Sequence, residues 1–167
     1  MKTFASICLI AVLILVPSSC GNDEKVCCTR AGKSALHFSQ LPLAPLPTVF
    51  TVDKVTAIRL YGEIKREGTS LRLRGWQEVP PGSGNKKDAA LMLLFSQLSC
   101  RVCAVTAEVH GHGNEARIVA TQRDGTTQTA VCSGGKQILT LDATRDNPFI
   151  WVIISGQEAE WLFFRLE

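Results

Sequence analysis

The sequence predicts an all-β protein, most simply an antiparallel β-sandwich, with a barrel as the alternative. Short segments rich in β-branched and alternating apolar residues follow one another at nearly regular spacing. Turn-forming pairs such as Asp124-Gly125 separate them, and no segment has a convincing amphipathic helical pattern. The 167 residues include 13 Gly and 7 Pro and show no internal repeat, which excludes solenoids, collagen and coiled coils.

The strands can be placed by this alternation and by the turns between them. Residues 29–54 are loop-like, with Pro42, Pro45 and Pro47 before a short strand, and residues 89–98 fit either a buried helical turn or a strand. Residues 149–155 are apolar on both faces, which favours a central strand. Strands are expected at 49–52, 55–61, 70–74, 100–109, 115–122, 127–132, 136–141, 149–155 and 160–166. The expected core aromatics are Phe149, Trp151, Trp161, Phe163 and Phe164.

The N-terminus predicts export. Lys2 precedes an apolar run from Phe4 to Val16, and small residues follow it, so residues 1–19 have the pattern of a secretory signal peptide. The run is shorter than the roughly 20 apolar residues that span a bilayer. We therefore divide the chain into a signal peptide (1–19), a Cys-rich tether (20–35) and a single β-sandwich domain (36–167).

Two forms of processing compete at Cys20. The segment from Val16 to Cys20 resembles a bacterial lipoprotein signal, in which cleavage before the cysteine exposes a thiol that is then acylated. Ser18 and Ser19 fit that pattern, whereas Pro17 departs from it. The alternative is ordinary cleavage near Cys20 or Gly21, which leaves a free secreted protein. The first reading predicts a lipid anchor at Cys20 in a bacterial cell envelope, and the second an extracellular location.

The seven cysteines bear on this choice. Cys8 leaves with the signal peptide. If Cys20 is acylated, five cysteines remain and at least one has no partner in the chain; otherwise six remain, enough for three bridges. Cys100 and Cys103 form a CxxC motif, but it falls on an expected strand with no helix after it, which disfavours a redox or zinc site. The disulfide candidates are Cys27, Cys28, Cys100, Cys103 and Cys132.

The C-terminal half resembles bacterial extracellular jelly rolls of the galactose-binding-like, carbohydrate-module type. The resemblance lies in the order of strands and turns from about Leu91 to Glu167: residues 116–120 followed by Asp124-Gly125, then 138–141, then residues 149–158 leading into the last strand. It implies a jelly-roll fold and, less specifically, a role in carbohydrate binding.

Candidate site residues are few. His110 and His112, with Glu108 or Glu115, are weak candidates for a metal site, but the flanking strands indicate a Gly-rich hairpin loop, where histidines are usually solvated; we predict no metal. His37 stands alone. No nucleophile elbow or Ser-His-Asp pattern occurs, so no catalytic residue is predicted.

One segment offers a ligand site. Arg72 and Arg74 face away from the alternating leucines, and Trp76 ends that strand before a loop, so that its ring could stack on a sugar. The formal charge of +3 is too small to indicate a nucleic-acid partner. The sequence thus predicts a non-catalytic binding or interaction module of the cell envelope, without a cofactor, whose partner is a glycan or an envelope protein. A free secreted, disulfide-stabilised structural or inhibitory protein is the alternative, and a small extracellular hydrolase is the third.

Overall fold

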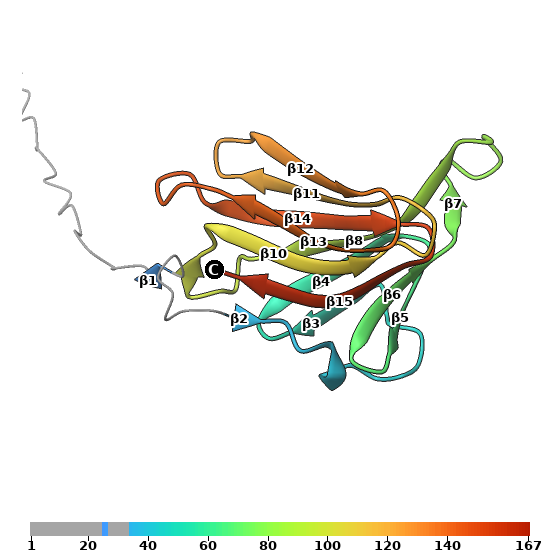
Figure 1. The fold of residues 1–167 in the computed structure, drawn as a ribbon, viewed down its shortest axis with the longest axis horizontal. Helices are drawn as coiled ribbons and strands as arrows, with labels where there is room; N and C mark the ends of the chain where they lie inside the picture. The colour runs from blue at the N-terminus through green and yellow to red at the C-terminus, as the bar shows by residue number, and fades with distance from the viewer. Residues whose placement is uncertain (1–24, 27–33) are drawn as a thin grey trace, which may run out of the picture.

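The computed structural model describes residues 25–26 and 34–167, which form two packed antiparallel β-sheets (Figure 1). We name each sheet after its central strand. The β15 sheet has the strand order β13-β10-β15-β6-β5, with β2 pairing beside β15. Its strands are β2 (Ser34–Ala35), β5 (Glu63–Glu67), β6 (Ser70–Arg74), β10 (Ala104–His110), β13 (Lys136–Asp142) and β15 (Ala159–Leu166).

The β14 sheet has the order β12-β11-β14-β8-β4-β3, with β7 pairing beside β8. Its strands are β3 (Val49–Val52), β4 (Val55–Tyr61), β7 (Trp76–Glu78), β8 (Lys86–Leu94), β11 (Ala116–Gln122), β12 (Thr127–Cys132) and β14 (Phe149–Gly156). The remaining pair, β1 (Lys25–Val26) and β9 (Cys100–Arg101), is parallel, and one 3-10 turn, η1, covers Phe38–Gln40. The all-β sandwich predicted from the sequence is confirmed.

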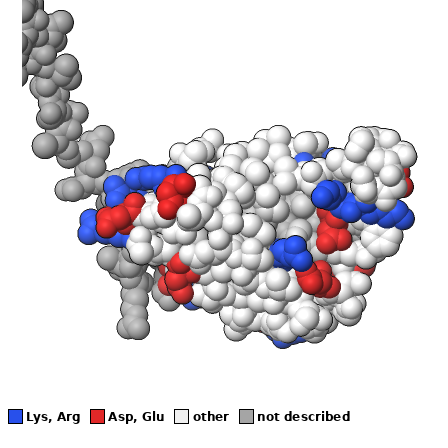
Figure 2. Space-filling view, turned by 90° about the horizontal axis from the view of Figure 1, so that it is seen from above, with Lys and Arg blue, Asp and Glu red and all other residues white. Residues whose placement is uncertain are grey.

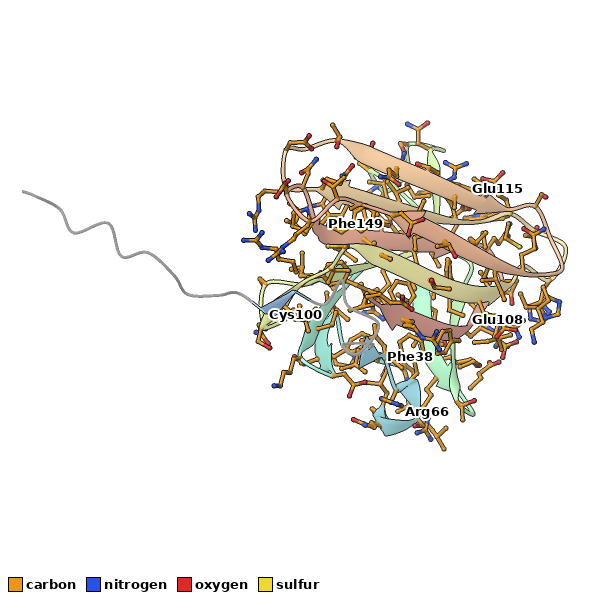
Figure 3. The ribbon with its side chains drawn as sticks, turned by 60° about the vertical axis from the view of Figure 1, so that its left-hand side comes forward. Phe38, Arg66, Cys100, Glu108, Glu115 and Phe149 are labelled. Carbon is orange, nitrogen blue, oxygen red and sulfur yellow. The ribbon has the colours of Figure 1, made fainter. Side chains whose placement is uncertain are left out.

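The core fills the space between the two sheets. Alternate residues of each strand point inward, as in β10, where Val105, Ala107 and Val109 are fully buried between half-exposed neighbours. Trp161 and Phe164 of β15 are the largest inward side chains of that strand, both with no exposed surface. The buried Phe38 of η1 belongs to the same core cluster (Figure 3). Within the described residues, no helix is long and apolar enough to span a membrane.

Two β-bulges decide which aromatic side chains enter this core. The pairing of β10 with β15 shifts between Glu108 and Val109, so that Phe164 lies on the inner side and Phe163 does not. The pairing of β11 with β14 shifts between Thr121 and Gln122, so that Phe149 is buried but Trp151 lies half-exposed on the outer side. The expectation that Trp151 and Phe163 belong to the core was therefore wrong.

Most expected strands are present, with a few differences. The strand expected at 100–109 is interrupted at Val102 and Cys103, which separate β9 from β10. The undecided segment 89–98 contributes its first part to the long strand β8. The strands β5 and β7 were not predicted, nor were β1 and β2, which lie in segments expected to be a tether and a loop. The loop at residues 110–114 is not a hairpin, because β10 belongs to the β15 sheet and β11 to the β14 sheet. The chain crosses there from one sheet to the other.

Candidate functional site

A hollow of 280 Å³ lies on the outer face of the β14 sheet. At its floor is Ala90 of β8, whose register partners are Tyr61 on β4 and Ser155 on β14. Because the alanine and serine side chains are much smaller than that of Tyr61, the sheet surface is depressed beside the tyrosine ring. The hollow is lined by Leu60, Tyr61, Lys87, Asp88, Ala90, Ile153 and Ser155. An aromatic ring, a hydroxyl and a carboxylate therefore meet around one small depression.

Trp76 is the cross-strand neighbour of Asp88, one of the residues that line this hollow. It pairs directly with Asp88 across the β7–β8 ladder, so the two side chains project from the same face. The Trp76 side chain is 45% exposed, unusual for so large an apolar group, and Lys86 Nζ lies 4.9 Å from its ring centroid. The exposed indole is thus held in place by a cation on one side.

Beyond the hollow, the outer face of the β14 sheet is largely uncharged. Cross-strand pairing joins Val119, Ile153, Met92 and Ile58 in one row across four strands. At the β12 and β11 edge of the sandwich, which Figure 2 views from above, charged groups gather mainly toward the two ends. The outer face of the β14 sheet itself presents the apolar row. Such a surface can accept the apolar face of a sugar ring or of another protein.

The structure places the predicted ligand residues in two different sheets. Arg72 and Arg74 lie on β6, in the β15 sheet, whereas Trp76 pairs with β8 of the β14 sheet. Both guanidinium groups form ion pairs with Glu67 and Glu158, at 3.0 Å for the Arg72–Glu158 and Arg74–Glu67 pairs. The residues that the structure adds beside Trp76 are Tyr61, Asp88 and Ser155, none of which the sequence pattern singled out.

The two candidate metal-binding histidines, His110 and His112, do lie together. The acidic residue beside them is Glu160 and not Glu108 or Glu115, which the sequence suggested. The ring centroids of His110 and His112 are 3.9 Å apart, and His112 Nε2 is 3.2 Å from Glu160 Oε2. Glu108 instead pairs with Lys136 at 2.6 Å, and Glu115 pairs with Arg117. A hydrogen bond from the Ser70 hydroxyl, with the nearby His112, holds the pKa of Glu160 below its usual range, so this carboxyl group stays ionised.

His37 also has a partner, which the sequence did not indicate. Its backbone N–H donates to Asp53 Oδ2 at 2.6 Å, and its Nδ1 lies 3.2 Å from the same oxygen. Asp53 has a positive φ of 47°, in the tight turn between β3 and β4. His37 therefore joins the segment before β3 to that turn.

The described cysteines differ in state. Cys100 and Cys103 are disulfide-bonded, whereas Cys132 is a free thiol with no exposed surface. Its Sγ lies 3.6 Å and 3.5 Å from the carbonyl oxygens of Gly134 and Gly135. The expectation that Cys132 forms a disulfide was therefore wrong. Cys20, Cys27 and Cys28, together with the signal peptide, lie outside the described residues.

Comparison with known proteins gives structural likeness alone. No protein-family profile and no curated protein matches the sequence. A solved structure of a mutant family 29 carbohydrate-binding module, CBM29-2 complexed with mannohexaose, is similar with a TM-score of 0.52 and 11% identity, over 80% of this chain and 90% of that one. Another module of the same family, CBM29_1 from Piromyces equi, is similar with a TM-score of 0.46 and 8% identity, over 80% of this chain and 90% of that one. At 11% identity the likeness to the first of these structures shows the fold alone, a β-sandwich.

Proposed function

We propose that this protein is a non-catalytic carbohydrate-binding module whose site is the hollow over Ala90 and the neighbouring Trp76. The observation that carries the proposal is Trp76, a large indole left 45% exposed beside a depression that contains polar groups. Sugar recognition in proteins combines stacking of a ring face on an aromatic side chain with hydrogen bonds to the hydroxyls. Here Trp76 and Tyr61 offer the rings, and Asp88 and Ser155 offer acceptors and a donor.

The fold supports a binding role rather than catalysis. The similar structure with a TM-score of 0.52 is a carbohydrate-binding module in complex with mannohexaose. A shallow, open depression on a sheet face suits an extended glycan, which contacts several neighbouring residues weakly. Arg72 and Arg74, predicted from the sequence as sugar ligands, stay a prediction; their ion pairs with Glu67 and Glu158 would have to open or to take part.

The test is binding of mannohexaose and of a panel of other oligosaccharides by calorimetry. We expect Trp76→Ala to weaken binding about fivefold or more, because a lost stacking contact costs on the order of 1 kcal/mol. Ala90→Leu should weaken binding too, because the larger side chain fills the hollow. Since position 90 borders that hollow, the leucine should extend into it with little loss of stability.

Phe163→Ala is the matched control. Phe163 lies on the other sheet and also carries a cation over its ring, with Arg165 Cζ 4.7 Å from the centroid. We expect this variant to bind glycans like the unaltered protein. Equal losses in Trp76→Ala and Phe163→Ala, or no binding to any glycan of the panel, would count against the proposed site.

We further propose that the module is exported and anchored through an acylated Cys20. The signal-like residues 1–19 and the small residues before Cys20 support this. The free, buried Cys132 also supports it, since three bridges among six mature cysteines would require that thiol. The same observation disfavours the alternative of a free secreted protein with three disulfides.

A further inference from the structure

Three metal-ligating side chains meet where the chain crosses between the sheets. His110 ends β10, His112 follows in the crossing loop, and Glu160 lies near the start of β15. The register of β10 and β15 pairs His110 directly with Glu160. One ligand atom from each of the three residues lies within 4.8 Å of the others. The cluster lies apart from the hollow over Ala90, and the inference below does not depend on glycan binding.

We propose that His110, His112 and Glu160 bind a divalent transition-metal ion, with Zn²⁺ the best match. Imidazole nitrogens and a carboxylate oxygen are ordinary zinc ligands, and three protein ligands leave a fourth position open to water or to a ligand. Tetrahedral ligand atoms about 2.1 Å from zinc are about 3.4 Å apart. The 3.2 Å separation of His112 Nε2 and Glu160 Oε2 already agrees with that spacing.

The carboxylate is oriented by a buried side chain. The hydroxyl of Ser70, 3% exposed, lies 2.6 Å from Glu160 Oε1 and 2.7 Å from the carbonyl oxygen of Glu67, and Glu160 Oε2 is left on the side of His112. Metal-binding carboxylates are commonly held in this way by a hydrogen bond to the oxygen that does not coordinate. Arg72, which pairs with Glu160 in register, forms its ion pairs with Glu67 and Glu158 and leaves Glu160 Oε2 to His112.

The histidine loop is also fixed in shape. Gly111 N–H donates to Gly135 O at 2.8 Å, and Asn114 N–H donates to Gly111 O at 2.6 Å. A Cβ at position 111 would lie 2.4 Å from Asn114 O, so only glycine fits there. His112 has a φ of 38°, a conformation that non-glycine residues seldom adopt. The backbone thus holds the two imidazoles close together before any ion arrives.

The test is a calorimetric titration of the untagged, metal-free protein with ZnCl₂. We expect one ion per chain, and we expect His112→Ala and Glu160→Gln each to weaken binding about tenfold or more. Ser70→Ala should cause a smaller loss, because Ser70 orients a ligand and does not contact the ion. His37→Ala is the matched control: it removes the third histidine of the chain, which pairs with Asp53, and should leave zinc binding unchanged.

Two outcomes would overturn the proposal. One is zinc binding that persists in the His110→Ala/His112→Ala double variant, which would place the ion elsewhere. The other is unaltered protein that binds zinc no better than this double variant does. Circular dichroism and thermal unfolding of each variant without zinc separate lost ligands from a lost fold. NMR adds a second measurement, in which zinc should shift the imidazole signals of His110 and His112 but not those of His37.

Discussion

At the tip of the β11–β12 hairpin, Asp124 lies in the turn that runs from Gln122 to Gly125, and its side chain is hydrogen-bonded to the residues around it. Its Oδ1 accepts hydrogen bonds from the Thr126 hydroxyl at 2.7 Å and from the Thr126 backbone N–H at 2.8 Å. These bonds, together with one from the Asn147 side chain, lower the pKa of Asp124 below its ordinary value of 3.8. The Asp124-Gly125 turn was evident in the sequence, but Thr126 and Asn147 as partners were not.

Asp124 should therefore make stability depend on pH in one direction. A carboxyl group whose pKa is lower in the folded state stabilises the fold above the unfolded pKa, near 3.8, and loses that contribution as pH falls through the lowered value. Urea unfolding of the unaltered protein and of Asp124→Asn, from pH 6 downward, should give a difference in unfolding free energy that shrinks below about pH 4.

Thr126→Val supplies the control for this prediction, because it removes the hydroxyl that donates to Asp124. When Thr126→Val is already present, Asp124→Asn should lower the unfolding free energy at pH 6 by less than it does in the unaltered protein. A difference between the unaltered protein and Asp124→Asn that stays constant or grows toward low pH would contradict the assignment of the lowered pKa to this turn.

At the scale of elements, local pattern predicted strands but not their partners. The bounds of β4, β6 and β12 agree with the predicted segments, because each has a turn at both ends and a period of two. Pairing depends on contacts between distant residues, so the crossing of residues 110–114 between the sheets was taken for a hairpin. The two bulges, which turn Trp151 and Phe163 outward, likewise arise from pairing.

For the candidate sites too, the sequence indicated single residues but not the partners that strand pairing brings to them. Trp76 stood out as an aromatic at a strand end, and the two histidines stood out by their spacing. Asp88 reaches Trp76, and Glu160 reaches the histidines, only through the register of neighbouring strands. Glu108 and Glu115, which are labelled in Figure 3 and are nearer to the histidines in sequence, form ion pairs with Lys136 and Arg117 instead.

The short β1–β9 pair predicts the disulfide map. Its parallel register pairs Lys25 with Cys100 and Val26 with Arg101. Cys27 and Cys28 come directly after β1 in the sequence, and Cys103 comes two residues after Arg101, so the pairing brings the two pairs of cysteines to the same part of the molecule. We expect these two cysteines to be the partners of Cys100 and Cys103. Trypsin cleaves after Arg101, between the latter two. Without reduction, the peptide 26–30 should therefore hold two separate peptides, one with Cys100 and one with Cys103.

Cys132 should appear in that digest as a thiol that iodoacetamide modifies only after unfolding, because it is fully buried. Cys132→Ser should leave the linked peptides unchanged. A bridge between Cys132 and any other cysteine, or a bond from Cys20 to Cys100, would contradict this map.

For the whole molecule, the disulfide map and the proposed anchor constrain each other. With Cys27, Cys28, Cys100 and Cys103 in two bridges and Cys132 buried as a thiol, Cys20 has no cysteine left to pair with in the mature chain. An unpaired cysteine directly after a signal peptide is the position at which bacterial lipoproteins are acylated, and two or more acyl chains give a stable membrane anchor. Because β1 pairs with β9 and β2 pairs with β15, the tether would be shorter than the 20–35 expected from the sequence, and the β-sandwich would be held to the envelope by the residues between Cys20 and β1.

The mass of the intact protein from its native host tests this arrangement. We expect a chain that begins at Cys20 and carries acyl chains, with a mass increase on reduction that corresponds to two disulfides. Cys20→Ser should abolish acylation and leave the protein in the soluble fraction, while the glycan site, distant from the tether in sequence, should bind as before. A bare chain with three disulfides would instead establish a free secreted module, and it would contradict both the anchor and the buried thiol at Cys132.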